Sequence, residues 1–317
     1  MTLVEIIIYI ISGLIMLFAG AEGLIRGSSS LALRVGITPL VVGLTVVAFG
    51  TSSPELVVSL KAALEGNGDI SLGNVIGSNI ANIALILGVS ALIKPMKVQA
   101  QVVRREIPIM IFVTLLLVLF LLDNEIRMIE GIVFFIGILL YSVASIFLAK
   151  KEKSREVKDE FIEGVVHKPL KIWIAILFIF FGLVLLVYGS NIFLEASVEI
   201  AKIFGMSQAV IGLTIIAVGT SLPELVTSAV AAYKNESDIA IGNVVGSNVF
   251  NILFILGITA IIIPVSARGI TSIDIIIMLL TAIVILPMAW SKFTLNRSEG
   301  VFLLIGYALY VYYLLPK

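Results

Sequence analysis

The sequence predicts an all-α polytopic membrane protein with ten transmembrane helices, arranged as two inverted five-helix repeats. Three observations lead to this prediction. Of the 317 residues, 60% are hydrophobic and only 13% are charged, whereas about a quarter of the residues in a soluble domain are charged. Apolar runs of about twenty residues, long enough to span a bilayer, recur from one end of the chain to the other. The third observation is an internal repeat.

The apolar runs define ten spans in order along the chain. Their approximate bounds are 4–26, 38–62, 70–93, 106–122, 127–149, 171–200, 207–232, 239–262, 271–290 and 298–315. We expect the first run to be a retained span, because it has neither the basic start nor the small-residue cleavage site of a signal peptide. Residues 150–170 form the only long polar connection. They are predicted to be a solvated linker between the halves 1–149 and 171–317.

The repeat joins two segments that lie far apart in the chain. Residues 43–93 align without a gap to residues 212–262, at a constant offset of 169, with 29 identities in 51 positions. Each half holds five spans, which is an odd number, so the second copy starts on the opposite side of the membrane from the first. The two copies are therefore predicted to have inverted topologies, an arrangement that many secondary transporters share.

Both copies carry a proline inside an apolar span. Pro54 and Pro223 lack the N–H that a helix interior needs, and each disfavours helical geometry in the residue before it. The spans 38–62 and 207–232 are therefore predicted to break at these prolines. We expect the breaks to leave backbone carbonyls unpaired around residues 47–50 and 216–219.

A glutamate follows each proline directly. Glu55 and Glu224 lie one turn after Thr51 and Thr220, on the same helix face. An ionised glutamate at the centre of a bilayer costs at least about 2.5–3.5 kcal/mol. Carboxylates, hydroxyls and free carbonyls form an all-oxygen ligand set, which suits Na⁺ and Ca²⁺ and not soft metals. The alternative is a structural pair of protonated or hydrogen-bonded glutamates. Their position at two symmetric helix breaks favours a cation site.

A second motif follows in both copies, at 73–82 and 242–251. Its glycines form a GxxxG pair in each copy and predict close helix packing. Its polar residues form one stripe per helix at a spacing of four, and interhelical hydrogen bonding competes with ion lining as their role. We favour ion lining for Ser78, Asn82, Ser247 and Asn251. Asp69 and Asp238, which precede the motif, are interpreted as helix caps.

The Lys and Arg residues predict the orientation. Loops after odd-numbered spans hold sixteen of the 21, and the remaining loops with both termini hold five. By the positive-inside rule both termini are extracellular and the linker 150–170 is cytoplasmic, in a multi-pass protein of the cell membrane. With zero net charge, no cysteine and one histidine, nucleic-acid binding, disulfides and an ordinary zinc site are not expected. We expect the lipid bilayer as a partner, no prosthetic group and no specific protein partner.

The paired GTSSPEL and GTSLPEL stretches, each followed by a GSN motif, resemble the repeats of the calcium/cation antiporter superfamily, and most closely those of prokaryotic sodium/calcium exchangers. The resemblance covers nearly the whole chain and implies a metal site between spans 2, 3, 7 and 8. It implies Glu55 and Glu224 as central ligands shared by Ca²⁺ and Na⁺. The further residues that it implies are Thr51 and Thr220 for Ca²⁺, the carbonyls of Ala48 and Ala217 with Ser78 and Ser247 for Na⁺, Asn82 and Asn251 as lining, and Ser52 and Ser221 from the same motif.

These observations together predict a secondary active antiporter, not an enzyme, that exchanges Ca²⁺ for Na⁺ by alternating access. Exchangers of this kind often have an aspartate where this chain has Asn251, so H⁺ or another cation stays open as the counter-ion. A passive cation channel is a further alternative. An intramembrane hydrolase is disfavoured, because acid and base roles need carboxyls in unlike environments.

Overall fold

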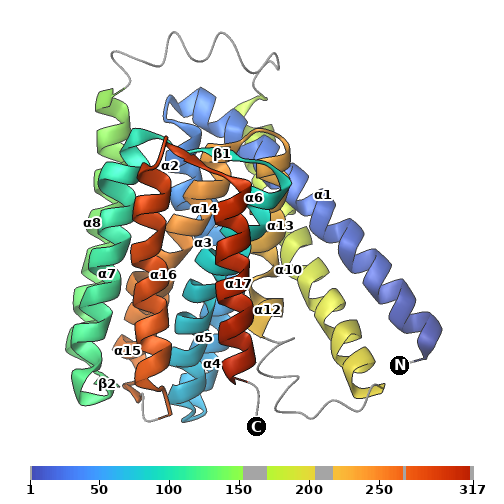
Figure 1. The fold of residues 1–317 in the computed structure, drawn as a ribbon. Helices are drawn as coiled ribbons and strands as arrows, with labels where there is room; N and C mark the ends of the chain where they lie inside the picture. Colours follow the sequence, from blue (N-terminus) through green and yellow to red (C-terminus); the bar gives the residue numbers. More distant parts are fainter. Residues whose placement is uncertain (1, 153–169, 204–216, 267–268, 315–317) are drawn as a thin grey trace.

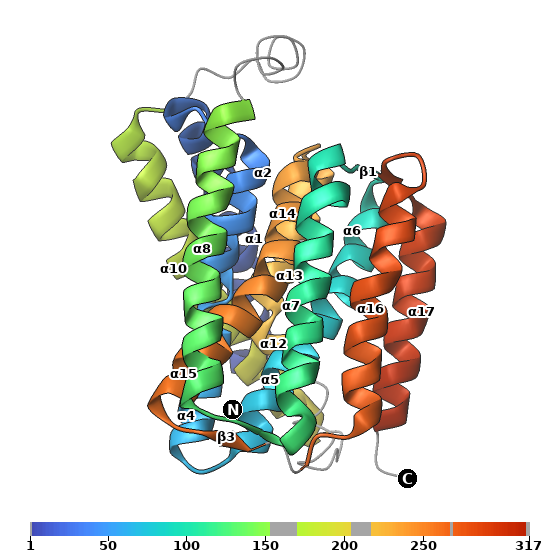
Figure 2. The same ribbon diagram turned by 90° about the vertical axis from the view of Figure 1, so that its left-hand side faces the viewer.

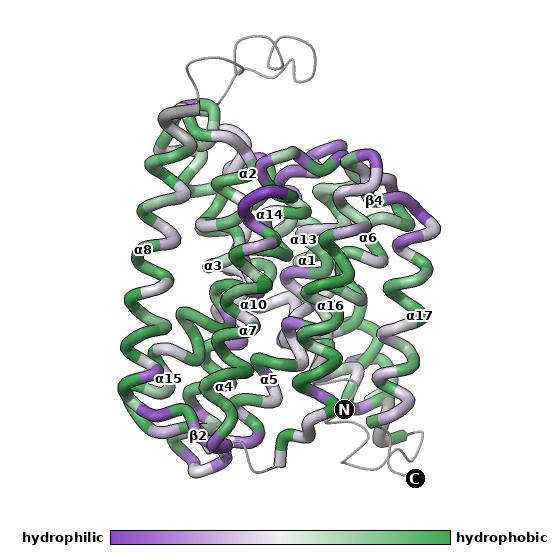
Figure 3. Tube along the Cα trace, turned by 60° about the vertical axis from the view of Figure 1, so that its left-hand side comes forward, coloured by the Kyte–Doolittle hydropathy of each residue, from purple (hydrophilic) through white to green (hydrophobic). Residues whose placement is uncertain are grey.

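The computed structural model describes residues 2–152, 170–203, 217–266 and 269–314. The chain forms a bundle of long helices whose middle portions are strongly hydrophobic, while polar residues gather toward the two ends (Figures 1 and 3). The first half contains α1 (Leu3–Val35), α2 (Pro39–Val42), η1 (Gly43–Val47), α3 (Ala48–Thr51), α4 (Ser53–Leu64), α5 (Gly68–Ala81), η2 (Asn82–Leu87), α6 (Gly88–Ile93), β1 (Met96–Lys97), η3 (Val102–Glu106), α7 (Ile107–Phe120), η4 (Leu121–Asp123), β2 (Glu125–Ile126) and α8 (Met128–Glu152).

The second half follows this order over the residues that the structure describes, except that these residues include no counterpart of the short turns η3 and η4. It contains α10 (Ile172–Ile203), α12 (Ala217–Thr220), α13 (Leu222–Tyr233), α14 (Ser237–Phe250), η6 (Asn251–Leu256), α15 (Gly257–Ile262), β3 (Val265–Ser266), α16 (Ser272–Trp290), β4 (Thr294–Leu295) and α17 (Arg297–Leu314). The all-helical, polytopic class predicted from the sequence is confirmed; the four strands are two-residue pieces in the connections.

Within the described residues, seven helices are long and apolar enough to cross a membrane, and a bent pair raises the number to eight. The bent pair is Pro39–Thr51 with Ser53–Leu64, at 45° to each other. It corresponds to the predicted span 38–62 and its predicted break. Part of the predicted span 207–232 and most of the linker 150–170 lie outside the described residues. The predicted span 298–315 coincides with α17, whose first turn carries Arg297 and Glu299.

Helices α1 and α10 pack tightly against each other, to one side of the other helices (Figure 1). A Cβ atom added to Gly20 would lie 2.7 Å from the carbonyl oxygen of Gly182, and one added to Gly13 would lie 3.0 Å from that of Gly189. Contacts that advance along one helix retreat along the other, so the two helices run in opposite directions. They are also equivalent under the offset of 169.

Two short antiparallel ribbons connect the halves. In one, Met96 of β1 pairs with Leu295 of β4, and in the other, Ile126 of β2 pairs with Val265 of β3. The offset of 169 carries β1 onto β3 and β2 onto β4, so the ribbons are equivalent. They lie at opposite ends of the molecule (Figures 1 and 2). Helix α1 begins and α17 ends toward the β2–β3 end (Figure 1).

Candidate functional site

The two buried glutamates stand at equivalent positions just after the helix breaks. Glu55 lies in the first turn of α4 and Glu224 in the first turn of α13, each with a proline immediately before it. The residues at the breaks, Ser52 and Ser221, leave regular helical geometry, with ψ near 8° and 12°. Each glutamate is only 1% exposed, so the breaks bring two carboxyl groups into the interior of the bundle.

Each carboxyl group is held by a serine from the opposite repeat. The Ser52 hydroxyl donates to Oε1 of Glu224 at 3.0 Å, and the Ser221 hydroxyl donates to Oε1 of Glu55 at 2.9 Å. The Ser221 hydroxyl also lies 3.3 Å from that of Ser78. These crossed bonds place the two helix breaks against each other, so residues from both repeats form one site.

Asparagines of α5 and α14 hold the glutamate turns in place. The Asn74 amide donates to the backbone oxygen of Glu55 at 3.2 Å and to the Ser59 hydroxyl at 2.9 Å. Asn243 makes the equivalent bonds to the Glu224 backbone and to Ser228. Its own Oδ1 accepts from the Thr51 hydroxyl at 3.0 Å, so Thr51 is tied to the second repeat.

The polar stripe of each copy ends in an asparagine that is the first residue of a π-helical turn. Asn82 is the first residue of η2 and Asn251 the first of η6. π-Helical turns inside α-helices are rare and occur frequently at functional sites. Each of these amides donates to an asparagine of the other repeat: Asn82 to Oδ1 of Asn248, and Asn251 to Oδ1 of Asn79, both at 3.0 Å.

Several oxygens of this network have no hydrogen-bond partner within the part of the chain that the structure describes. All are fully buried, where an unsatisfied polar atom is costly. They are Glu55 Oε2, Glu224 Oε2, Asn82 Oδ1, Asn251 Oδ1 and Ser247 Oγ. Two ionised carboxylates in one buried site also repel each other electrostatically. A set of buried, unpaired oxygens with two carboxylates fits a hard cation, which would satisfy the lone pairs and offset the repulsion.

The expectation of unpaired carbonyls at the breaks is wrong at three positions. The carbonyl of Val47 accepts from the Thr51 hydroxyl at 3.1 Å, and that of Ala48 accepts from the Ser52 N–H at 3.0 Å. The carbonyl of Gly219 accepts from the Ser190 hydroxyl at 2.8 Å. The reason is local: each proline removes only its own N–H. The Ser52 N–H still reaches the Ala48 carbonyl, and the hydroxyls of Thr51 and Ser190 reach the other two.

The other predicted residues are placed as follows. Ser78 and Ser247 are buried in α5 and α14, and Thr220 is buried at the end of α12. Ala48 is buried in α3, while the side chain of Ala217 lies outside the described residues. Asn79 and Asn248 were not predicted as site residues, because they fall beside the polar stripe and not on it. Their identity in both copies was the signal that could have revealed them.

The GxxxG glycines of the second copy pack as predicted. A Cβ atom at Gly242 would lie 2.8 Å from the Leu40 carbonyl oxygen, and one at Gly246 would lie 2.6 Å from that of Leu44. The equivalent partners of Gly73 and Gly77 would be residues near 209 and 213, which lie outside the described residues.

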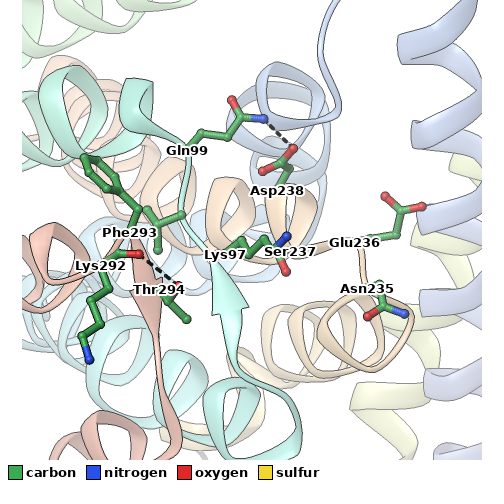
Figure 4. Close-up of a pocket in the computed structure, with 10 residues that line it drawn as sticks. Lys97, Gln99, Asn235, Glu236, Ser237, Asp238, Lys292, Phe293 and Thr294 are labelled. Atoms are coloured by element: carbon green, nitrogen blue, oxygen red, sulfur yellow. Dashed lines mark hydrogen bonds between the residues drawn. The ribbon is translucent and has the colours of Figure 1, made fainter. Parts of the chain in front are cut away.

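A cavity of about 490 Å³ opens at the β1–β4 end, away from the glutamates (Figure 4). It is lined by charges of both signs, from Lys97, Lys292, Glu236 and Asp238. Asp238 accepts from the Gln99 amide at 2.6 Å, and Asp69 accepts from the N–H of Gly269 at 2.7 Å. The interpretation of these aspartates as helix caps is therefore wrong: they lie within the first turn and bond to loops of the other half.

Known proteins match this chain over nearly its whole length. Residues 5–147 and 174–315 each match the family of sodium/calcium exchanger proteins. The chain is 39% identical to CaxA of Alkalimonas amylolytica, over 97% of this chain and 98% of that protein. It is 32% identical to sodium/calcium exchanger MaX1 of Methanosarcina acetivorans, over 94% and 95% of the two chains.

A solved structure has the same fold. The sodium-calcium exchanger NCX_Mj, soaked with Na⁺ and Ca²⁺, superposes with a TM-score of 0.85 at 27% sequence identity, and the match covers 100% of both chains. The resemblance drawn from the paired motifs is therefore confirmed.

Proposed function

Because this chain belongs to the family of sodium/calcium exchanger proteins, we propose that it exchanges Ca²⁺ for Na⁺ by alternating access. It is a multi-pass membrane protein and a cation antiporter, not an enzyme. The observation that best supports the choice of ions is the cluster of buried, unpaired oxygens around Glu55 and Glu224. Oxygen-only sites with carboxylates are the kind that hard cations occupy.

In this proposal Glu55 and Glu224 are the central ligands, shared by both ions in turn. Their crossed bonds to Ser52 and Ser221 fix one oxygen of each carboxyl and leave the other free for a cation. The remaining ligands and lining groups would be Thr51, Thr220, Ser78, Ser247, Asn82 and Asn251, with carbonyls of Ala48 and Ala217. Without a cation, two buried carboxylates repel, which disfavours occlusion; a bound cation removes that penalty.

We also propose that the fold comprises ten spans in two inverted units, 1–149 and 171–317, joined by the cytoplasmic linker 150–170. Three observations support it: equivalent helices α1 and α10 run in opposite directions, equivalent ribbons lie at opposite ends, and both units match the family. The cell membrane as location, with both termini extracellular, belongs to the same proposal.

Sodium-gradient-driven calcium uptake into proteoliposomes tests the function. Glu55→Gln and Glu224→Gln should each reduce uptake to background, because an amide keeps the shape and removes the charge that balances Ca²⁺. Glu65→Gln, an exposed change at the end of α4, is the matched control and should transport normally. Calcium uptake that persists in both glutamate variants would contradict the assignment of Glu55 and Glu224 as the central ligands.

The number of charges at the site favours a different counter-ion as the second candidate. Asn82 and Asn251 are both neutral, so the site carries two carboxylates, which balance one Ca²⁺. It lacks the third negative charge that sodium/calcium exchangers often have, as an aspartate, at the position of Asn251. Calcium uptake that follows a pH gradient and ignores Na⁺ would assign the chain as a proton/calcium antiporter. Uptake that needs no counter-ion at all would indicate a channel.

A further inference from the structure

Four buried asparagines connect the two repeats next to the glutamates. Asn79 and Asn82 come from the first repeat, and Asn248 and Asn251 are their equivalents at the offset of 169. All four are at most 2% exposed. The two 3.0 Å bonds, Asn82 to Asn248 and Asn251 to Asn79, exchange with each other when the repeats are exchanged.

The bonds determine which atom of each amide is left over. A side-chain amide is planar, with its oxygen and its NH₂ group on opposite sides. The NH₂ group of Asn82 is engaged by Asn248 and that of Asn251 by Asn79. The oxygens left over, Asn82 Oδ1 and Asn251 Oδ1, are buried and have no partner in the part of the chain that the structure describes.

Asn79 and Asn248, the two outer asparagines, are themselves anchored by hydrogen bonds. Asn82 and Asn251 are the two inner asparagines. The Asn79 amide donates to the backbone oxygen of Asn248 at 3.4 Å. The Asn248 amide donates to the sulfur of Met110 at 3.4 Å. Each therefore keeps its NH₂ group turned away and offers an oxygen to its neighbour. If either of these amides were turned over, its NH₂ group would face the NH₂ group of Asn82 or Asn251, and the hydrogen bond would be lost.

We propose that Asn79 and Asn248 are positioning residues, which hold Asn251 and Asn82 with their oxygens toward the transported cation. The proposal rests on the proposed function of this site as a cation site. Neither outer asparagine needs to touch the ion. Without its acceptor, an inner amide can turn over and present its NH₂ group, the positive end of the amide dipole, to the cation. Ion affinity would then fall although every predicted ligand is still present.

The pairing is crossed, and this makes the test specific. Asn79→Leu and Asn248→Leu remove one acceptor each at similar side-chain size. Each should raise the half-saturating Ca²⁺ concentration for uptake by about tenfold, the scale of one hydrogen bond to a charged group, with a smaller change in the maximal rate. Thr259→Val is the matched control, because this buried threonine bonds only to its own helix, at Ile255; it should leave the half-saturating concentration unchanged.

Double substitutions separate positioning from a general structural effect. In an Asn251→Ala background the effect of Asn79→Leu should disappear, whereas the effect of Asn248→Leu should persist; in an Asn82→Ala background the reverse should hold. Additive effects in all four combinations would overturn the proposal, as would an unchanged half-saturating concentration in both single variants. If a leucine variant does not fold, Asn79→Ala and Asn248→Ala take its place.

Calcium binding to the purified protein, measured by titration calorimetry, distinguishes this inference from the function on which it rests. A wild-type protein that binds neither Ca²⁺ nor Na⁺ contradicts the proposed function. A wild-type protein that binds Ca²⁺ with the same affinity as Asn79→Leu and Asn248→Leu contradicts only the positioning role.

Discussion

At the site, serines of each half hydrogen-bond to the glutamate of the other half. Ser52 and Ser221 each donate to the carboxyl group of the opposite repeat, at 3.0 and 2.9 Å. Hydrogen bonds to a charged group are worth about 1.5–3 kcal/mol. The crossed arrangement means that neither glutamate is oriented by its own repeat alone.

Replacing one of these serines should weaken ion binding. Ser221→Ala frees the carboxyl of Glu55 to turn, so we expect the half-saturating Ca²⁺ concentration for uptake to rise about ten- to a hundredfold, since each 1.4 kcal/mol is a factor of ten. Ser53→Ala is the control, because the Ser53 hydroxyl donates to its own helix at Phe49. Equal half-saturating concentrations in the two variants would show that the crossed bond contributes nothing.

A carboxyl group outside the spans predicts a dependence of stability on pH. Burial raises the pKa of Glu236, while the Ser29 hydroxyl and Lys234 lower it. The folded state therefore holds the proton more tightly than the unfolded state, and the free energy of unfolding falls as the pH rises from the ordinary to the raised pKa. Glu236→Gln should flatten this fall in thermal unfolding measured across that pH range. An unchanged slope would show that the raised pKa of Glu236 does not contribute to the pH dependence of stability.

At the residue scale, the sequence predicted which residues are equivalent but not which ones meet. The repeat singled out Glu55 and Glu224 because their identity and spacing recur. It did not predict that Asn82 meets Asn248 and not Asn251, since an offset relates positions within each copy and says nothing about contacts between copies. The paired carbonyls at the breaks were missed for a similar reason: a proline shows which N–H is missing, but not which hydroxyls and N–H groups still reach the carbonyls.

At the scale of elements, the α1–α10 pair depends on close backbone approach. Such contacts in membranes are made where small residues allow the helices to come together. Gly13 faces Gly189, the equivalent of Gly20, and Gly20 faces Gly182, the equivalent of Gly13. The pair therefore has the symmetry of the repeat itself.

A methyl group added at Gly20 should push these two helices apart. In Gly20→Ala the new Cβ would lie 2.7 Å from a backbone oxygen, so we expect a loss of about 1–3 kcal/mol of stability from overpacking. Gly23→Ala in the same helix meets nothing closer than 3.5 Å and gains helix propensity. Thermal unfolding in detergent should give a lower Tm for the first variant only; equal values would contradict the packing argument.

Helix α1 is also tied to α13 by an ion pair between Glu22 and Lys234. The equivalent positions, Asn191 and Glu65, cannot form such a pair. Partly exposed pairs contribute at most about 1 kcal/mol. The contact therefore marks a difference between the two halves and not a main source of stability.

At the scale of the whole molecule, the prediction of a helical polytopic fold succeeded because hydropathy and the repeat act over long stretches of chain. Seven helices and one bent pair could be placed from apolar runs alone. The two ribbons could not be predicted, because each strand has only two residues and pairs with a partner about 140 to 200 positions away.

The orientation can be tested directly, since the chain has no cysteine. Thr2→Cys should react with a membrane-impermeant maleimide from outside intact cells, and Glu160→Cys should react only after the membrane is opened. Ser298→Cys, in the exposed first turn of α17, serves as a second cytoplasmic control, because this turn starts the last span on the side opposite the C-terminus. Labelling of Glu160→Cys in intact cells would contradict the proposed topology.

The two ribbons bear on how such a chain could have arisen. Both pair a strand of one half with a strand of the other, at opposite faces, and the crossed serine and asparagine bonds do the same inside. A single half would therefore have open strand edges at both faces and half a ligand set, all of which an upside-down copy of itself could complete. An ancestral gene of half this length would have needed its product to insert in both orientations and dimerise. Fusion through a linker would then have freed the two halves to diverge, as Glu22 and Asn191 have done.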